Sequence, residues 1–242
     1  MKNYYQTKKQ INVSDVDVNY NLKLDYILNY LQDVTTCHSY ELGVDRENLV
    51  KSSNAFWVLT KMMVLFNRLP RWNEEVTIKT YPTTISPIRF FREYSITSDS
   101  GVSINGKSEW CVLDAQTQAI RRSNSINYPT EMEHLKPNPN IPDFSRLKEQ
   151  VCSSDYIYTY KVMQTDIDCN EHTNNVVYLK MALNSFSLQE FKELSFKGIE
   201  INFLSQSYFG DEIDIFKKKV DDGYYIEGKI QDKTIFVCKL YV

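Results

Sequence analysis

The chain has 242 residues, 42% of them hydrophobic and 13% aromatic, which is enough apolar surface for one large domain or two small ones sharing a core. Its formal charge of −3 gives no case for nucleic-acid binding, and no stretch approaches the ~20 apolar residues of a membrane span. Five cysteines without regular spacing and three histidines argue against a disulfide framework and a zinc site. We therefore expect a soluble cytoplasmic protein without metal or cofactor, because the amino terminus also lacks an apolar signal stretch.

The first half predicts a strand, one long helix and then a run of strands. The first strand is expected at residues 4–13. A helix is expected at residues 22–42, because leucine and isoleucine recur there at helical spacing and Gly43 follows as a terminator. Further strands, separated by turn signals, are expected at residues 56–67, 75–81, 88–97 and 103–113. This order predicts an α+β unit with one central helix against an antiparallel sheet.

A proline-containing segment divides the chain near its middle. Residues 123–150 contain four prolines and little periodicity, which predicts an extended connector. After it the same order returns: a strand at 155–163, a helix at 175–193, and strands at 198–206, 212–220, 223–230 and 234–241. We expect a first domain at 1–122, a linker at 123–152 and a second domain at 153–242.

The two halves also share sequence. Residues 15–21 (Asp-Val-Asp-Val-Asn-Tyr-Asn) match residues 166–172 (Asp-Ile-Asp-Cys-Asn-Glu-His) at an offset of 151, and residues 73–76 resemble residues 210–213. This self-similarity indicates an old duplication. The first copy holds Asn21 where the second holds His172, so only the second copy keeps a group that titrates near neutrality.

Residues 166–175 form the most polar motif of the chain and directly precede the second helix. If the segment is extended, Asp166, Asp168, Asn170 and His172 share one face. A calcium loop is disfavoured because Glu171 stands at the glycine position and the twelfth residue is a valine. Cys169 would point away from the histidine, so we do not expect a thiol nucleophile.

The motif resembles the active-site signature of acyl-acyl-carrier-protein thioesterases, Asp-x-Asn-x-His-x-Asn-Asn before a central helix. Further segments match the family at their relative positions: Trp57–Met62, Leu69–Trp72, Thr80–Pro82, Trp110 and Arg121–Arg122. The resemblance implies a tandem hot-dog fold, in which each half is a long central helix wrapped by an antiparallel sheet. It also implies hydrolysis of fatty acyl-carrier thioesters, with release of free fatty acid.

The resemblance places four catalytic residues in the second half. His172 is expected to activate or position water, Asp168 to orient the imidazole or act as base, and Asn170 to orient water or the thioester. Amides at the start of the 175–193 helix would form the oxyanion site. The family's further glutamate corresponds to Gln206, which cannot accept a proton but can hold water. Glu200 shares the face of Gln206 but lies six strand residues away, about 20 Å, too far to replace it.

Asn174, Asn175 and Trp57 are the expected substrate-binding residues, and both central helices would line a tunnel for the acyl chain. The implied partner is an acidic acyl carrier protein. It would dock on one of five basic clusters: Lys8–Lys9, Arg68 with Arg71, Arg89 with Arg92, Arg121–Arg122 or Lys217–Lys219. Two other classes stay open: a non-catalytic acyl-binding protein, which Gln206 favours, and a hot-dog dehydratase. Coenzyme A in place of carrier protein, acyl chain length and a homodimer also stay open.

Overall fold

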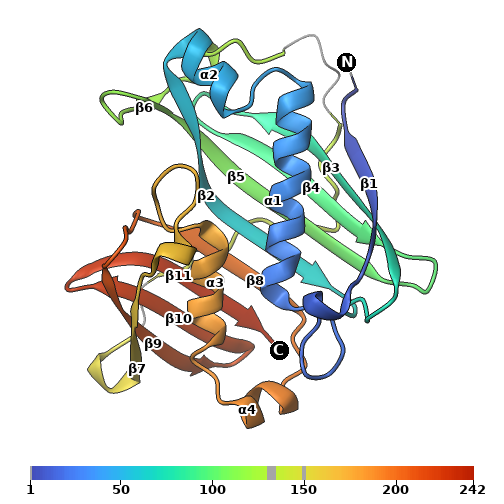
Figure 1. Cartoon of the computed structure of the whole chain (residues 1–242), viewed down its shortest axis with the longest axis vertical. Coiled ribbons are helices and arrows are strands. Elements are labelled where there is room, and N and C mark those ends of the chain that lie inside the picture. Colours follow the sequence, from blue (N-terminus) through green and yellow to red (C-terminus); the bar gives the residue numbers. More distant parts are fainter. Residues whose placement is uncertain (1, 130–134, 149–150) are drawn as a thin grey trace. The chain divides into compact units, whose positions relative to one another are not determined.

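The computed structural model describes residues 2–129, 135–148 and 151–242, and these divide into two compact units. The first unit contains Met1–Lys23 and Ile27–Asp143, and the second contains Leu24–Tyr26 and Phe144–Val242. Each unit is a helix set against an antiparallel sheet, which confirms the α+β prediction (Figure 1). The expected domain limits and linker remain predictions, and part of that linker lies outside the described residues.

In the first unit the long helix packs on a sheet with the strand order β1-β3-β4-β5-β2 and a short β6 beside β5. The elements are β1 Tyr5–Gln10, α1 Leu24–Glu41, α2 Arg46–Ser53, β2 Ala55–Phe66, β3 Glu75–Ile85, β4 Phe90–Thr97, β5 Ser103–Asp114 and β6 Ile120–Arg121. A buried hydroxyl chain joins the helix to the sheet: Thr35 lies 2.9 Å from the Tyr94 hydroxyl, which lies 2.9 Å from Ser108 Oγ. The bounds of these elements confirm the predicted helix and strands of this half, apart from a few terminal residues.

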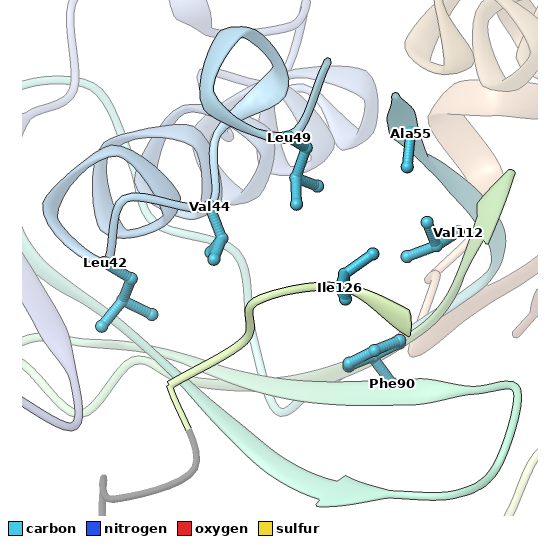
Figure 2. Packing of buried hydrophobic residues seen from close by; sticks show 7 residues of the cluster. All are labelled: Leu42, Val44, Leu49, Ala55, Phe90, Val112 and Ile126. Carbon is cyan, nitrogen blue, oxygen red and sulfur yellow. The ribbon is translucent and has the colours of Figure 1, made fainter. Parts of the chain in front are cut away.

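The helix α2 was not expected from the sequence. Asp45 caps it by accepting hydrogen bonds from the amides of Glu47 and Asn48, and Asn54 ends it in the left-handed conformation with φ 47°. Only Leu49 of this helix is buried, so the segment lacks the apolar periodicity by which helices are recognised. Figure 2 shows Leu49 in a cluster of buried side chains: Leu42, Val44, Leu49, Ala55, Phe90, Val112 and Ile126.

In the second unit the strand order is β8-β11-β10-β9-β7, again antiparallel throughout. The elements are β7 Tyr156–Lys161, α3 Asn175–Leu183, α4 Leu188–Glu193, β8 Gly198–Phe203, β9 Glu212–Val220, β10 Gly223–Ile230 and β11 Lys233–Tyr241. Tyr178 of α3 packs on Phe236 of β11 with ring centroids 5.4 Å apart. Phe236 in turn occupies the space beside Gly228, where an added Cβ would lie 2.2 Å from the ring.

Two expectations for this half were wrong. The helix predicted at 175–193 is broken, because the Ser187 side chain accepts from the Glu190 amide and starts a separate helix. The strand predicted at 198–206 ends at Phe203. It ends there because the amides of Leu204 and Ser205 both donate to the carbonyl of Ile235, which turns the chain away from the sheet.

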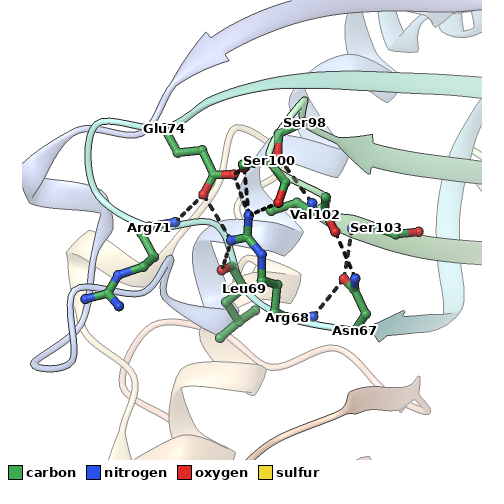
Figure 3. A network of polar contacts seen from close by, with 10 residues as sticks. Asn67, Arg68, Leu69, Arg71, Glu74, Ser98, Ser100, Val102 and Ser103 are labelled. Carbon is green, nitrogen blue, oxygen red and sulfur yellow. Dashed lines mark hydrogen bonds and ion pairs between the residues drawn. The ribbon is translucent and has the colours of Figure 1, made fainter.

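A polar network holds the segment between β2 and β3 of the first unit (Figure 3). The Arg68 guanidinium donates to both carboxylate oxygens of Glu74, at 2.9 and 3.1 Å, and the Arg71 amide donates to Glu74 Oε2 at 3.0 Å. Ser98 and Ser100 donate to the same carboxylate. Burial alone would raise the pKa of Glu74, but these hydrogen bonds outweigh it and lower the pKa to about 2.

Replacing Glu74 with glutamine is expected to destabilise the fold by roughly 1–3 kcal/mol at neutral pH, because charge-assisted hydrogen bonds are lost. The folded pKa of about 2 lies below the usual 4.5, so the carboxylate's contribution is complete above about pH 4.5 and is lost as pH falls toward 2. Unfolding free energies of parent and Glu74→Gln should therefore converge over that window. Glu47→Gln, at a side chain that is 81% exposed, is the control. A parent–variant difference that does not change with pH would contradict this assignment.

Candidate active site

The polar motif of the second unit is a tight turn. The carbonyl of Asp168 accepts from the Glu171 amide at 3.0 Å, and the Asp168 amide donates to the carbonyl of His172 at 2.9 Å. Glu171 closes the turn in the left-handed conformation, with φ 62°. The expectation of an extended segment with one polar face is therefore wrong, because the chain reverses between Asp168 and His172.

Asp166 lies at the base of this turn and has a structural role. It is 9% exposed, and its Oδ2 accepts from the Tyr160 hydroxyl at 3.0 Å and from the Met163 amide at 2.8 Å. Its carbonyl accepts from the Asn174 amide at 2.8 Å. Burial, followed by the bond to Asp166, raises the pKa of Tyr160 to about 12, so this tyrosine stays protonated and donates. Asp166 is thus not part of the cluster that a substrate would meet.

The half-buried Asp168 carboxylate is bonded to Asn170. Its Oδ1 accepts from the Asn170 amide at 2.7 Å, and its Oδ2 accepts from the Asn170 side-chain nitrogen at 3.3 Å. Within the described residues, no hydrogen bond joins this carboxylate to the His172 imidazole. Asp168 therefore orients Asn170 directly. Cys169, between them, is exposed.

Tyr208 connects His172 with Gln206. Its ring and the half-buried imidazole lie in an edge arrangement, with centroids 5.2 Å apart and planes at 64°. Its hydroxyl donates to Gln206 Oε1 at 3.4 Å. Gln206 lies in the segment after β8 and not on the strand where it was expected, yet this segment brings it beside the histidine loop. No sequence pattern points to Tyr208, an exposed aromatic residue on that segment.

Glu200 is fully buried on β8, and both of its carboxylate oxygens accept hydrogen bonds. It accepts from the Ser145 amide at 2.6 Å and from the Tyr241 hydroxyl at 2.8 Å. Burial, opposed by the bond with Ser145 and reinforced by the bond to Glu200, raises the pKa of Tyr241 to about 12. These contacts give Glu200 a structural task, separate from the loop that carries Gln206.

The three expected substrate-binding residues all contribute to local structure. Asn174 caps α3 through a 3.0 Å bond from the Val176 amide to its side chain, and Asn175 is the half-buried first residue of that helix. Trp57, in the first unit, donates its indole N–H to the carbonyl of Val44 at 2.7 Å and packs edge-on against Phe90.

The first unit contains a second copy of the site's backbone. The Asp17 carbonyl accepts from the Tyr20 amide at 3.0 Å, and the Asp17 amide donates to the carbonyl of Asn21 at 2.8 Å. Asp17 Oδ1 accepts from the Asn19 amide at 2.8 Å. Tyr20 has φ 61°, as Glu171 has 62°. Asp15 repeats the buried base, since it accepts from the Tyr30 hydroxyl at 2.7 Å. The offset of 151 therefore holds for the backbone bonds of the loop, whereas the tyrosine that donates to the buried aspartate comes from α1 in the first unit and from β7 in the second.

The segment that carries Gln206 is duplicated as well, at an offset of 137. The Arg71 amide donates to Glu74 as the Tyr208 amide donates to Asp211, at 3.0 and 2.8 Å. Asn73 and Gly210 follow at matching positions with φ 64° and 88°. This register places Leu69 at the position of Gln206. The two loops thus share a backbone, and the first has Asn21 and Leu69 where the second has His172 and Gln206.

Comparison with known proteins identifies the family. The profile of the acyl-ACP thioesterase N-terminal domain matches residues 2–126, and that of the acyl-ACP thioesterase C-terminal domain matches residues 150–239. The chain belongs to the acyl-ACP thioesterase family. The two profiles match in succession, one to each half of the chain.

Plant members of the family are distant relatives. The chain is 26% identical over 180 residues to the acyl-[acyl-carrier-protein] hydrolase FATB1 of Cuphea viscosissima, a match that covers 69% of this chain and 42% of that protein. It is 20% identical over 225 residues to the oleoyl-acyl carrier protein thioesterase 2 of Arabidopsis thaliana, covering 87% and 61%. The chain thus spans less than two thirds of the length of these relatives.

Solved structures of family members share the fold. An acyl-ACP thioesterase from Bacteroides thetaiotaomicron matches with a TM-score of 0.89 at 21% identity, covering 99% of this chain and 97% of that one. The 12:0-ACP thioesterase from Umbellularia californica matches with a TM-score of 0.80 at 12% identity, covering 98% and 93%. The prediction of a tandem hot-dog fold is therefore confirmed.

Membrane-spanning helices and metal clusters are absent from the part of the chain that the structure describes. No helix in residues 2–129, 135–148 and 151–242 combines the length and the apolar character needed to cross a membrane. The same residues contain no group of three or more histidine, cysteine, aspartate or glutamate side chains arranged to hold a metal ion.

Proposed function

We propose that the chain hydrolyses the thioester of fatty acyl-acyl-carrier protein at a single site in the second unit. One observation carries the proposal: two loops with the same hydrogen-bonded backbone differ in their side chains at His172 and Gln206. The first loop forms this backbone with Asn21 and Leu69. Neither the imidazole of His172 nor the side-chain amide of Gln206 is therefore needed to form it. Membership of the acyl-ACP thioesterase family indicates the reaction in which the side chains of His172 and Gln206 would act.

In the proposed reaction water attacks the thioester carbonyl carbon. His172 takes a proton from the water as the C–O bond forms, and the carbonyl oxygen becomes an oxyanion. The oxyanion then re-forms the carbonyl as the C–S bond breaks, and the thiol leaves with the proton from His172. The products are the free acid and the carrier thiol.

The start of α3 is the proposed oxyanion site. The Val176 amide is bonded to the Asn174 side chain, and the Val177 amide to the Asn174 carbonyl, at 3.0 and 2.9 Å. The Asn175 amide has no acceptor in the part of the chain that the structure describes, so it can meet an oxyanion at the positive end of the helix dipole. Asp168 contributes by holding Asn170, whose side chain would orient the thioester or the water.

We propose that the first unit serves as scaffold and as a wall for the acyl chain. Trp57 supports this role with an aromatic surface, because its only polar side-chain atom is already bonded to Val44. The expected domain limits at residues 122 and 153 are retained within this proposal, as are a cytoplasmic location and a homodimer.

A second candidate function is acyl binding without turnover. The specific observation in its favour is Gln206, an amide that can hold water but cannot take a proton from it. This candidate keeps the same fold and the same site. Measurement of catalytic turnover separates the two.

Among the arginines of two expected docking clusters, Arg68 with Arg71 and Arg89 with Arg92, we propose Arg71 as the docking residue. The Arg68 guanidinium is bonded to Glu74, Arg89 lies 3.1 Å from Glu109, and Arg92 is only 6% exposed. Arg71 is exposed, and Figure 3 shows its guanidinium directed away from the network. A carrier protein with acidic side chains is therefore proposed to meet Arg71 rather than Arg68.

The test compares an acyl-carrier thioester with the matching coenzyme A ester over a range of salt concentrations. Arg71→Glu is expected to raise KM for the carrier substrate roughly fivefold. This change corresponds to the about 1 kcal/mol that an exposed ion pair contributes. Salt should raise KM for the parent in the same way, since exposed charges are screened beyond ~8 Å at physiological ionic strength.

Arg46→Glu is the control, because Arg46 is an exposed arginine on α2 outside the docking clusters. Equal turnover of both esters, with KM unaffected by salt and by Arg71→Glu, would show that the carrier protein is not the recognised partner.

A further inference from the structure

Three buried hydroxyl groups cluster directly behind the candidate site. Thr173, Tyr178 and Ser207 are 4%, 2% and 0% exposed. Ser207 Oγ lies 2.7 Å from Thr173 Oγ1 and 2.9 Å from the Tyr178 hydroxyl. Burial raises the pKa of Tyr178 despite the opposing hydrogen bonds from Ser207, so its hydroxyl stays protonated.

One assignment of donors satisfies the whole cluster. The Ser207 amide donates to the Tyr178 oxygen at 3.1 Å, and the Tyr178 hydroxyl donates to Ser207 Oγ. The Ser207 hydroxyl donates to Thr173 Oγ1, and the Thr173 hydroxyl donates to the Ser207 carbonyl at 3.1 Å. Every donor is used once, and fully satisfied buried networks of this kind are rigid.

The cluster joins the segments that carry the site. Thr173 directly follows His172, and Ser207 lies between Gln206 and Tyr208. The Thr173 amide also donates to the Ser207 carbonyl at 2.9 Å. Tyr178 is on the first turn of α3, so both segments are fixed to the same helix.

The first unit forms the same backbone without these hydroxyls. The two duplication offsets place Leu22, Ile27 and Pro70 at the positions of Thr173, Tyr178 and Ser207, and all three are buried. The Leu22 amide donates to the Pro70 carbonyl at 2.7 Å, so the backbone link is kept. Proline has no N–H, and therefore no tyrosine is needed to accept from it. The loop architecture thus does not depend on the hydroxyl cluster.

We propose that Thr173, Tyr178 and Ser207 are positioning residues that hold the His172 loop and the Gln206 segment in the geometry of thioester hydrolysis. This inference rests on the proposed function. A misplacement of about 1 Å at a reacting centre can lower a rate about 10²-fold. A closed set of short hydrogen bonds restricts such displacements more than the apolar contacts at the corresponding positions of the first unit.

The test measures kcat and KM of Thr173→Val and Tyr178→Phe with one acyl-carrier substrate, together with thermal melts. Each variant should lower kcat about 10- to 100-fold and change KM less than about twofold, because the chemical geometry is disturbed and not the binding surface. Thr173→Ser keeps the hydroxyl and should retain the parent rate. Ser108→Ala, which removes a buried hydroxyl that lies 2.9 Å from the Tyr94 hydroxyl in the first unit, should leave kcat unchanged.

Tyr178→Phe leaves the Ser207 amide without an acceptor, so it is paired with the double variant Tyr178→Phe/Ser207→Pro. The double variant copies the solution of the first unit and should recover the melting temperature but not kcat. Hydrogen exchange of residues 168–174 is measured on the same proteins and should be at least about tenfold faster in both.

Folded variants with parent kcat would overturn the proposal, and so would equal losses in Thr173→Val and Thr173→Ser. If the parent itself releases no acid, the proposed function fails. The exchange rates then decide separately whether the cluster fixes the loop, and unchanged exchange in folded variants would refute that too.

Discussion

Replacing His172 with alanine is expected to lower kcat by about 10²–10⁴, the usual contribution of a positioned general base. The imidazole is half-buried and lies in an edge arrangement with the Tyr208 ring, beside the segment that carries Gln206. The fold should persist, because Asn21 occupies the same backbone position in the first unit. Acid release and thermal unfolding of the purified variant measure both effects.

Asn21→Ala is the matched control for this change. It removes a side chain from the same position of a loop with the same backbone bonds and should leave kcat unchanged. Asp168→Asn should also remove most activity, whereas Asp17→Asn should not. A folded His172→Ala protein with near-parent activity would show that the polar loop is structural.

Replacing Gln206 with glutamate is expected to raise kcat and to change the pH–rate profile. A carboxylate at this position could take a proton from the attacking water, and general-base catalysis typically contributes ~10²–10⁴ in rate. The Tyr208 hydroxyl, 3.4 Å from Gln206 Oε1, could donate to that carboxylate in the same way. If His172 already supplies the base, the increase is small and the new acid limb of the profile is the main effect.

Leu69→Glu places the same carboxylate at the matching position of the first unit and is the control. It should give neither a faster rate nor a new limb, because the first loop has Asn21 where an imidazole is needed. Identical profiles for the parent and Gln206→Glu would show that this side chain does not reach the thioester.

Much of the fold could be predicted because its patterns are local. Alternation of apolar residues predicted β9 and β10 with the bounds observed, Glu212–Val220 and Gly223–Ile230. The long α1 was predicted within two residues at each end. The break between α3 and α4 was missed because the apolar pattern continues through Ser187, and only its capping bonds show where the second helix starts.

The shape of the candidate site was not predictable in the same way. An extended loop was expected, but Glu171 adopts φ 62°, a conformation that its residue type does not favour. The position of Gln206 depends on the turn after Phe203, which long-range bonds to Ile235 create. The duplication contains a usable signal, however, since the repeated residues alone align Asn21 with His172.

The most direct test of a single hydrolytic site is the amount of free fatty acid that the parent chain releases from an acyl-carrier thioester, measured by mass spectrometry against the number of chains. We expect many equivalents of acid per chain, released about 10²–10⁴-fold more slowly by His172→Ala and at the parent rate by Asn21→Ala. Release of less than one equivalent per chain, with the thioester bound and intact, would contradict hydrolysis and identify the protein as an acyl binder.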